Sequence, residues 1–356
     1  MNKSKSSNNK EHTQLNPDIN NDPYFSNPED LVEDAISPVL SITPMNQYIE
    51  EVKNLSIPNQ LFGNFWYEGE VCILFSSTGR GKSILAVQIA DSISRGKSIF
   101  NFENSLEPTR IAYLDIELYG KLVEHRYSDN FSHHYQFSEN FFRLDINPSA
   151  IDENTSLADQ VLIDIVRISK EHSIKIFIID NITALITDFE KSRNAVKLMK
   201  QLYNLKKDRG LSFLVLAHTP KIDSTKEITS DHLAGSKVLM NLCDSAFAIG
   251  QSITNESVRY LKQIKARYGP IEYGTNNVIK CFIEKAADNM LKITYDCTAK
   301  EILFLSTYRD SDKQARAEMI VKLKDEKEMT FENIGKELGM SKGAANKIYH
   351  KTIKNK

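Results

Sequence analysis

The chain has 356 residues, a formal net charge of −2 and four cysteines. This length allows two or three domains with a sizeable core, and the near-neutral charge excludes a chain coated in basic residues. No apolar run approaches the ~18 residues that cross a membrane, and the first residues lack the apolar region of a signal peptide. We therefore expect a cytoplasmic protein without membrane contact, with free, mostly buried thiols at Cys72, Cys243, Cys281 and Cys297.

Residues 1–43 are expected to form a disordered arm. They are rich in Asn, Ser, Asp, Glu and Pro, so they bury too little apolar surface to offset the entropy of ordering. A helix packed beside the next domain is predicted by four apolar residues at helical spacing: Met45, Tyr48, Ile49 and Val52. The aromatic run Phe65-Trp66-Tyr67 favours core packing over a base-stacking surface.

A glycine-containing turn stands between a predicted strand and a predicted helix. The apolar run Val71 to Phe75 precedes it and a helical segment from Ile84 to Ser94 follows. Backbone N–H groups of such a turn point at phosphate oxygens, and the helix N-terminus adds about half a positive charge. Lys82 would neutralise the β and γ phosphates, and the Ser83 hydroxyl would hold Mg²⁺.

The predicted nucleotide site takes ATP and Mg²⁺ and comprises nine consecutive residues: Ser76, Ser77, Thr78, Gly79, Arg80, Gly81, Lys82, Ser83 and Ile84. This sequence departs from the G-x-x-x-x-G-K-[ST] pattern at its first position, where Ser76 replaces glycine. The alternative is a lysine-containing turn in an ordinary strand–helix unit. The flanking strand and helix favour the phosphate loop.

Carboxylates follow two later apolar strands. The strand Arg110 to Glu117 ends in Asp115 and Glu117, and the carboxyl ends of parallel strands are where ligands bind in open α/β sheets. Glu117 is predicted to orient or deprotonate an attacking water, whereas Asp115 is more simply a helix cap. The strand Ile176 to Asp180 ends in the carboxylate expected to hold the Mg²⁺ water shell, which makes Ser83 and Asp180 the predicted metal ligands.

A further strand, Ser212 to Ala217, ends at His218 and Thr219. Histidine at a strand end can sense a γ phosphate, although a structural histidine is an equal alternative. The following loop, residues 220–237, carries both lysines and acids. Mixed charge indicates a solvated loop, but its position beside His218 makes it the natural place for nucleic-acid contacts that respond to the nucleotide.

Past Asp244 the pattern changes to successive strands, which would extend the sheet with antiparallel hairpins: 246–249, 258–267, 278–284 and 291–295. Residues alternate along Val258 to Arg267, so Lys265 and Arg267 are expected to project together from a tip ended by Gly269-Pro270. A tip has few partners within its own chain. The alternative is that Lys265 and Arg267 are solvated side chains at the end of a strand, without a functional role.

The order of these motifs resembles RecA-like P-loop ATPases, and among them hexameric replicative helicases and plasmid RepA-type AAA family ATPases. The resemblance spans roughly residues 62–305. It implies a mainly parallel α/β sheet, Glu117 as catalytic base, His218 as sensor, and Lys265 and Arg267 acting on the nucleotide of a neighbouring subunit. It also implies a homo-oligomer, expected to be a hexamer, with single-stranded DNA in its ring or groove.

The segment after residue 308 is predicted to form a helix-turn-helix. Thr330 to Leu338 and Lys342 to Lys354 are the two helices, with Thr330 and Ser341 as N-caps. Five lysines and no acid lie between Lys342 and Lys356, as expected for a helix in a DNA groove. Solvated C-terminal lysines are the alternative. A support helix is predicted from Ala315, Met319, Ile320 and Leu323.

We therefore expect an arm (1–43), an ATPase domain (44–308) and a duplex-binding tail (309–356). The expected function is a DNA-acting ATP hydrolase, a helicase or loader in replication or mobilisation of a genetic element. One alternative is a DNA-bound regulator whose ATPase is an assembly switch without strand separation. Another is a clock- or signalling-type ATPase that binds proteins and no DNA.

Overall fold

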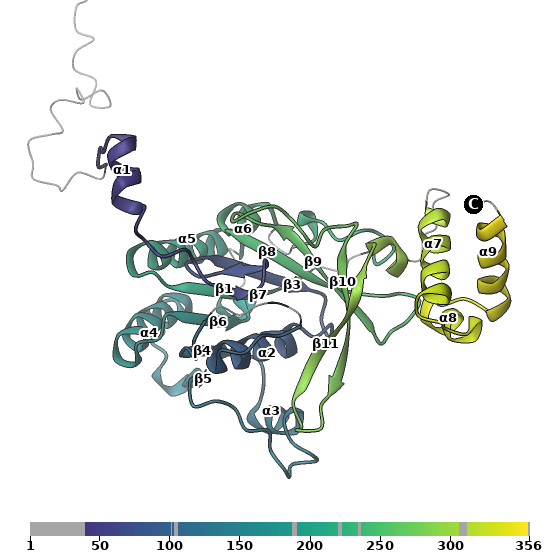
Figure 1. The fold of residues 1–356 in the computed structure, drawn as a ribbon. Coiled ribbons are helices and arrows are strands. Elements are labelled where there is room, and N and C mark those ends of the chain that lie inside the picture. The colour runs from purple at the N-terminus through teal and green to yellow at the C-terminus, as the bar shows by residue number, and fades with distance from the viewer. Residues whose placement is uncertain are drawn as a thin grey trace, which may run out of the picture. The chain divides into compact units, whose positions relative to one another are not determined.

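The computed structural model describes residues 40–100, 102, 106–186, 191–219, 223–233, 236–305 and 312–354 (Figure 1). It divides into two units, one up to Ile57 and one from Pro58 onward. The first contains α1 (Met45–Val52), which is the predicted helix. Its packing beside the next domain stays a prediction, as do the boundaries after residues 43 and 308. The predicted arm lies outside the described residues except for 40–43.

The second unit is built on a nine-stranded sheet in the order β11-β10-β9-β8-β3-β7-β6-β4-β5. Six neighbouring strands are parallel: β8 (Ser245–Gln251), β3 (Val71–Ser76), β7 (Ser212–His218), β6 (Ile176–Asp180), β4 (Ile111–Asp115) and β5 (Phe141–Leu144). The antiparallel extension consists of β9 (Val258–Lys265), β10 (Val278–Lys285) and β11 (Leu291–Ala299). This is the predicted RecA-like α/β fold with an antiparallel C-terminal extension.

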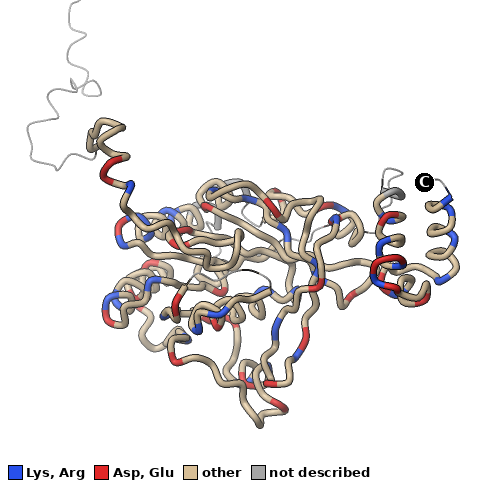
Figure 2. The backbone as a smooth tube through the Cα atoms, in the orientation of Figure 1, with Lys and Arg blue, Asp and Glu red and all other residues tan. Residues whose placement is uncertain are grey.

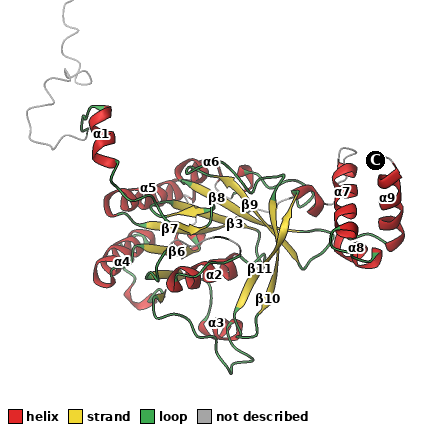
Figure 3. Cartoon of the chain, in the orientation of Figure 1, coloured by secondary structure: helices red, strands yellow, loops and turns green. Residues whose placement is uncertain are grey.

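Helices cover both faces of the sheet (Figure 3). One face packs against α4 (Leu157–His172), α5 (Lys191–Arg209) and α6 (Ser236–Leu242), and the other against α2 (Lys82–Arg95) and α3 (Gly120–Arg126). Side chains of β3 alternate between these two cores, with Ile73 and Phe75 in one and Cys72 and Leu74 in the other. That alternation explains why β3 is an unbroken apolar run in the sequence.

A short hairpin, β1 (Gln60–Phe62) and β2 (Trp66–Tyr67), adds aromatic rings to the core beside α2. Phe65 and Trp66 are fully buried, and the Phe65 ring stacks on Tyr273 with centroids 5.3 Å apart. The prediction of core packing for this aromatic run is therefore confirmed. Short 3₁₀ turns occur at η2 (Pro148–Ala150), η3 (Ile182–Leu185), η5 (Ser230–His232) and η6 (Glu301–Phe304).

Three C-terminal helices form a small cluster with its own apolar core: α7 (Asp312–Asp325), α8 (Phe331–Leu338) and α9 (Lys342–Lys354). Both predicted caps are present, since the Thr330 hydroxyl accepts from the N–H of Asn333 at 3.3 Å and that of Ser341 from Ala344 at 3.2 Å. The predicted support helix is α7, whose Ile320 and Leu323 are buried. Within the described residues, no helix has the length and apolar character needed to span a membrane.

Candidate functional site

The predicted phosphate loop connects β3 to α2. Gly79 and Gly81 both have positive φ, of 75° and 103°, which only glycine adopts without strain. Gly81 is also the N-cap of α2, and a Cβ there would lie 2.8 Å from the Cδ1 atom of Ile283. Ser76 is the last residue of β3, where extended backbone suits any residue, so its replacement of glycine does not disturb the turn.

Lys82 is buried at the start of α2 with its ammonium beneath the loop. The ammonium donates to the carbonyl oxygens of Ser76 at 3.0 Å and Ser77 at 3.4 Å, and lies 3.2 Å from Nδ1 of His218. Burial lowers the pKa of Lys82, although Asp180 and Glu117 act in the opposite direction. These acceptors are neutral groups, so phosphate oxygens at the loop would supply the anion that a buried ammonium requires.

The predicted metal ligands, Ser83 and Asp180, are brought together by the structure. The carboxylate of Asp180 accepts a hydrogen bond from the hydroxyl of Tyr113, and the Ser83 hydroxyl lies near enough to influence its pKa. Burial raises the pKa of Asp180, and the hydroxyls of Ser83 and Tyr113 oppose this shift. Magnesium keeps several waters and takes one or two protein oxygens together with phosphates. A hydroxyl and a carboxylate beside a phosphate loop fit that requirement.

Glu117 lies two residues beyond the end of β4 and faces the ends of two neighbouring strands. Its Oε1 atom lies 3.3 Å from Nε2 of His218 and accepts from the side-chain amide of Asn181. Nδ1 of His218 lies beside the Lys82 ammonium, and Nε2 lies beside both Glu117 and the side-chain amide of Asn181, the latter at 3.1 Å, so the imidazole bridges the lysine and the carboxylate. Glu117 is 42% exposed at its side chain, so water can reach the carboxylate.

The register of the sheet explains why these residues meet. Ser76 pairs with His218 across β3 and β7, and Asp115 pairs with Asp180 across β4 and β6. All four are the last residues of adjacent parallel strands, so they lie together at the carboxyl ends of these strands. Thr219 adds a further link, since its hydroxyl lies 3.0 Å from that of Ser77.

The expectation that one strand extends from Arg110 through Asp115 to Glu117 is wrong. The strand ends at Asp115, whose carboxylate accepts from the N–H of Leu118 at 2.9 Å and starts a turn there. Asp115 is buried and forms an ion pair with Arg143 at 3.2 Å. These contacts give Asp115 the capping role and leave Glu117 as the carboxylate that faces His218.

Two expectations about Lys265 and Arg267 are also wrong. β9 ends at Lys265, and each cation has a partner within its own chain. Lys265 donates to the carbonyl oxygens of Met240 and Cys243, both at 2.6 Å, and Arg267 pairs with the buried Asp244 at 3.1 Å. β9 runs antiparallel to β8, which brings its end beside the turn from α6 into β8, where these acceptors lie.

These two cations lie far from the phosphate loop of their own chain. Lys265 pairs with Ala246 at the start of β8, and the start of β8 lies beside the start of β3. The phosphate loop follows the other end of β3. An action of Lys265 or Arg267 on a nucleotide would therefore require a neighbouring subunit, and that role stays a prediction.

Two side chains of the site are not predicted from the sequence pattern. Asn181 follows Asp180 and binds Glu117, and Tyr113 lies within β4 and donates to Asp180. Asn181 could have been predicted as a site residue, because it directly follows the acidic residue that ends a buried strand. Nothing in the sequence distinguishes Tyr113 from an ordinary core residue of β4, because its role depends on which strand lies beside it.

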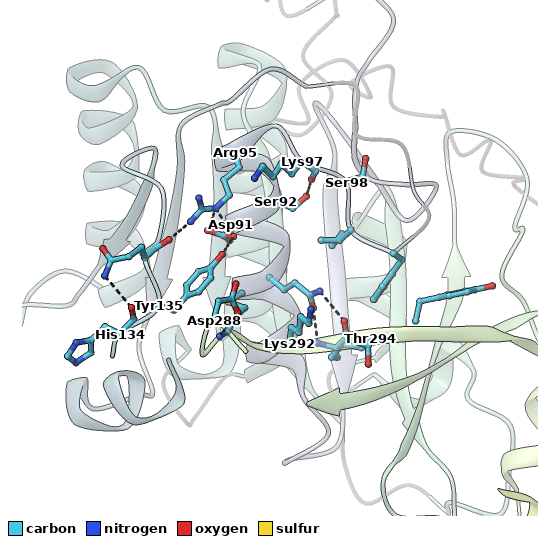
Figure 4. Close-up of a pocket in the computed structure, with 17 residues that line it drawn as sticks. Asp91, Ser92, Arg95, Lys97, Ser98, His134, Tyr135, Asp288, Lys292 and Thr294 are labelled. Carbon is cyan, nitrogen blue, oxygen red and sulfur yellow. Dashed lines mark hydrogen bonds and ion pairs between the residues drawn. The ribbon is translucent and has the colours of Figure 1, made fainter. Parts of the chain in front are cut away.

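A separate pocket of about 840 Å³ lies along the C-terminal half of α2 and β11 (Figure 4). Arg95 pairs with Asp91 at 2.9 Å, and the hydroxyl of Tyr135 donates to the same carboxylate at 2.7 Å. These bonds hold the segment before β5 against α2. Lys82 begins α2 and Arg95 ends it, so this pocket is distinct from the phosphate loop.

Comparisons with known proteins place the phosphate loop in a family. Residues 44–224, just over half of the chain, match a family described as AAA domain. A solved structure, the KaiC-like protein PH0186 from the hyperthermophilic archaeon Pyrococcus horikoshii OT3, is similar at 15% identity with a TM-score of 0.44, over 65% of this chain and 91% of that one. No curated protein matches the chain. The family match includes the phosphate loop, Glu117, Asp180 and His218, and the chain therefore belongs to the AAA domain family of P-loop ATPases.

Proposed function

We propose that the chain binds ATP with Mg²⁺ at the loop between β3 and α2 and hydrolyses it. Lys82 would hold the β and γ phosphates, and Ser83 and Asp180 would hold the metal, which polarises the phosphates when bound. Glu117 would take a proton from the attacking water, and His218 would report on the γ phosphate. The observation that carries this proposal is the convergence of Lys82, Asp180 and Glu117 at the carboxyl ends of neighbouring parallel strands.

We further propose that this ATPase acts on DNA, with duplex bound by the C-terminal helices. Lysines and no acid lie along α9 (Figure 2). The exposed basic and amide residues of this helix recur at helical spacing: Lys342, Asn346, Lys347, His350, Lys351 and Lys354. Lysines contact phosphates and an asparagine can read an adenine edge. A Cβ on Gly335 would lie 2.6 Å from the Met340 carbonyl oxygen, so glycine allows the close turn between α8 and α9.

A helicase or loader in replication or mobilisation of a genetic element is the function we favour. Its ring or filament, expected to be a hexamer, would hold single-stranded DNA and place Lys265 and Arg267 at the nucleotide of the next subunit. Mixing Arg267→Ala subunits with Lys82→Ala subunits tests this arrangement. Activity should partly return in mixed assemblies, because some interfaces join an intact loop to an intact arginine. Mixtures that stay inactive although co-assembly is verified would refute the shared site.

The deciding experiment is an ATPase assay with no DNA, with an oligo(dT) strand and with duplex, beside a mass measurement in the presence of nucleotide. Stimulation by the single strand and a ring-sized mass support the motor. Duplex binding without translocation supports the regulatory alternative, in which ATP turnover switches assembly on DNA. Indifference to both DNAs would support a protein-binding ATPase and reject the DNA role.

A further inference from the structure

A small apolar pocket of about 180 Å³ is lined by residues of α2, α3, β4 and β5 and of the loops beside them. Apolar and aromatic side chains form most of its wall: Val87, Tyr113, Leu118, Val123, Tyr127, Phe137 and Phe141. Among the described residues that line it, none belongs to the phosphate loop or to the larger pocket of Figure 4. An apolar cavity of about 150 Å³ is large enough to bind benzene, so this pocket has room for one ring.

The four aromatic rings of this wall contact one another edge to face. The ring of Phe137 has its centroid 5.1 Å from that of Tyr127 and 5.4 Å from that of Phe141. Phe141 in turn contacts Tyr113, with centroids 6.4 Å apart. Such contacts hold the rings in fixed orientations, and a further ring can pack on them in the same manner. The wall therefore favours an aromatic occupant over an aliphatic one.

Tyr127 supplies a polar group at this apolar pocket. Its side chain is 5% exposed, and its hydroxyl has no hydrogen-bond partner among the residues that the structure describes. A buried hydroxyl without a partner is unfavourable, and native structures contain few of them. Burial raises the pKa of Tyr127, so the group stays protonated and can donate a hydrogen bond. The pocket thus offers a donor to an occupant that carries an acceptor.

The charged side chains that line the pocket leave one cation over. Asp115 accepts from Arg143 at 3.2 and 3.3 Å, so these two residues compensate each other. Arg126 is half-buried, and its guanidinium forms no ion pair or hydrogen bond within the described part of the chain. It lies near enough to Tyr127 to oppose the rise in the pKa of that hydroxyl. Arginine binds carboxylates through two parallel hydrogen bonds, so this end of the pocket suits a carboxylate.

We infer that this pocket binds a small aromatic carboxylate. The ring would pack against Tyr113, Phe137 and Phe141, and the carboxylate would accept hydrogen bonds from Arg126 and from the hydroxyl of Tyr127. This site is separate from those proposed for ATP and for DNA. Its occupant would nevertheless lie against Tyr113, whose hydroxyl donates to Asp180 at the proposed metal site.

Benzoate is the probe that tests the site. Titrated into the full-length protein without nucleotide or DNA, benzoate should bind saturably and shift the methyl NMR signals of Val87, Leu118 and Val123. The result does not depend on ATP hydrolysis, so a failure of the proposed function would leave this test unaffected. Benzoate that does not saturate, or that leaves all three methyl signals unshifted, would overturn the inference.

Related compounds test the chemical class of the ligand. Benzamide has the shape of benzoate without its charge, and it should bind about fivefold more weakly or less, because hydrogen bonds to charged groups are the stronger ones. Cyclohexanecarboxylate keeps the charge but has no aromatic ring, and it should bind about threefold more weakly. Equal affinity of benzamide and benzoate would contradict a carboxylate site, and equal affinity of the two carboxylates would contradict the aromatic preference.

Tyr127→Phe separates a role in binding from a role in the fold. The variant loses a buried hydroxyl that has no partner, so its thermal stability without benzoate should be unchanged or higher. Its affinity for benzoate should fall about fivefold, as expected for the loss of one hydrogen bond to a charged group. A variant that is less stable and binds benzoate like the wild type would show a structural role for the hydroxyl and overturn its assignment.

Arg126→Gln should weaken benzoate binding about tenfold or more, because a charge-assisted pair is lost. Lys121→Gln is the matched control, since Lys121 lies on the same helix, is exposed and does not line the pocket. This control should bind benzoate like the wild type. A loss of equal size in both variants would reflect the overall charge of α3 and contradict a direct contact with Arg126.

Discussion

His218 lies between Lys82 and Glu117, with Nδ1 3.2 Å from the Lys82 ammonium and Nε2 3.3 Å from the Glu117 carboxylate. One imidazole thus contacts the predicted phosphate cation and the predicted base. If bound phosphates draw the Lys82 ammonium away, Nδ1 of His218 loses its hydrogen-bond donor. The imidazole can then reorient, which changes its contact between Nε2 and Glu117. This geometry gives the sensor role proposed for His218 a direct route to the base.

Glu117→Gln should retain ATP binding and slow hydrolysis by about a hundredfold or more, because a positioned general base contributes about 10² to 10⁴ in rate. Glutamine keeps an oxygen to accept from Asn181, so the local geometry should survive. Single-turnover hydrolysis and equilibrium nucleotide binding, measured on the same preparation, separate the two effects.

Asp115→Asn is the matched control for that variant. Its carboxylate pairs with Arg143 and caps the turn at Leu118, so the substitution should lower the melting temperature and leave nucleotide binding intact. If Asp115→Asn proves more damaging to hydrolysis than Glu117→Gln in folded protein, the base has been misassigned.

Asp159 should give the fold a measurable pH dependence. Hydrogen bonds from Gln201, Lys197 and Ser156 lower the pKa of this carboxyl to about 2. The unfolded-state value is about 3.9, so the ionised group stabilises the fold above about pH 4, and this contribution is lost as the pH falls from about 4 to about 2.

Asp159→Asn should therefore lower the free energy of unfolding by about 1 kcal/mol at neutral pH, where the carboxylate is ionised in both states. Urea unfolding at a series of pH values should find the gap to the wild type narrowing below about pH 4. Asp164→Asn, on the same helix, removes an exposed partner of Arg167 and should give a smaller gap. A constant gap across the series would contradict the assigned pKa.

Lys347→Gln with Lys351→Gln on α9 should weaken duplex binding and reduce the slope of log K against log salt by about 2, since each phosphate contact releases counterions. Basal ATP turnover should be unaffected. Fluorescence anisotropy with labelled duplex at several salt concentrations measures the slope. Lys170→Gln, on α4, should leave it unchanged, and an unchanged slope in the α9 variant would remove the DNA role of that helix.

Much of the fold and of the site can be predicted from the sequence, because the features concerned depend on residues close together in the chain. β6 is an apolar run closed by an acid, and its predicted limits at Ile176 and Asp180 are those of the structure. The caps Thr330 and Ser341 likewise follow from residues within one helical turn. Short-range chemistry decides such features, so spacing alone locates them.

Other features depend on which distant segments pair, and spacing does not carry that information. Lys262 falls on the apolar face of its strand in the alternation pattern, yet it is buried against Glu301, 39 residues away. Arg267 has Asp244 as a partner only because β9 folds back along β8. Asp115, the last residue of β4, has its ion-pair partner Arg143 on the neighbouring strand β5, 28 residues away.

Turnover of Mg²⁺–ATP by the wild type and by Lys82→Ala is the most direct test of the central claim. Lys82 is the cation that the loop between β3 and α2 offers to the phosphates, and alanine cannot replace its charge. The account predicts hydrolysis by the wild type and none by the folded variant, together with weaker nucleotide binding. Wild-type turnover in Lys82→Ala would contradict the assignment of this loop as the site of ATP hydrolysis.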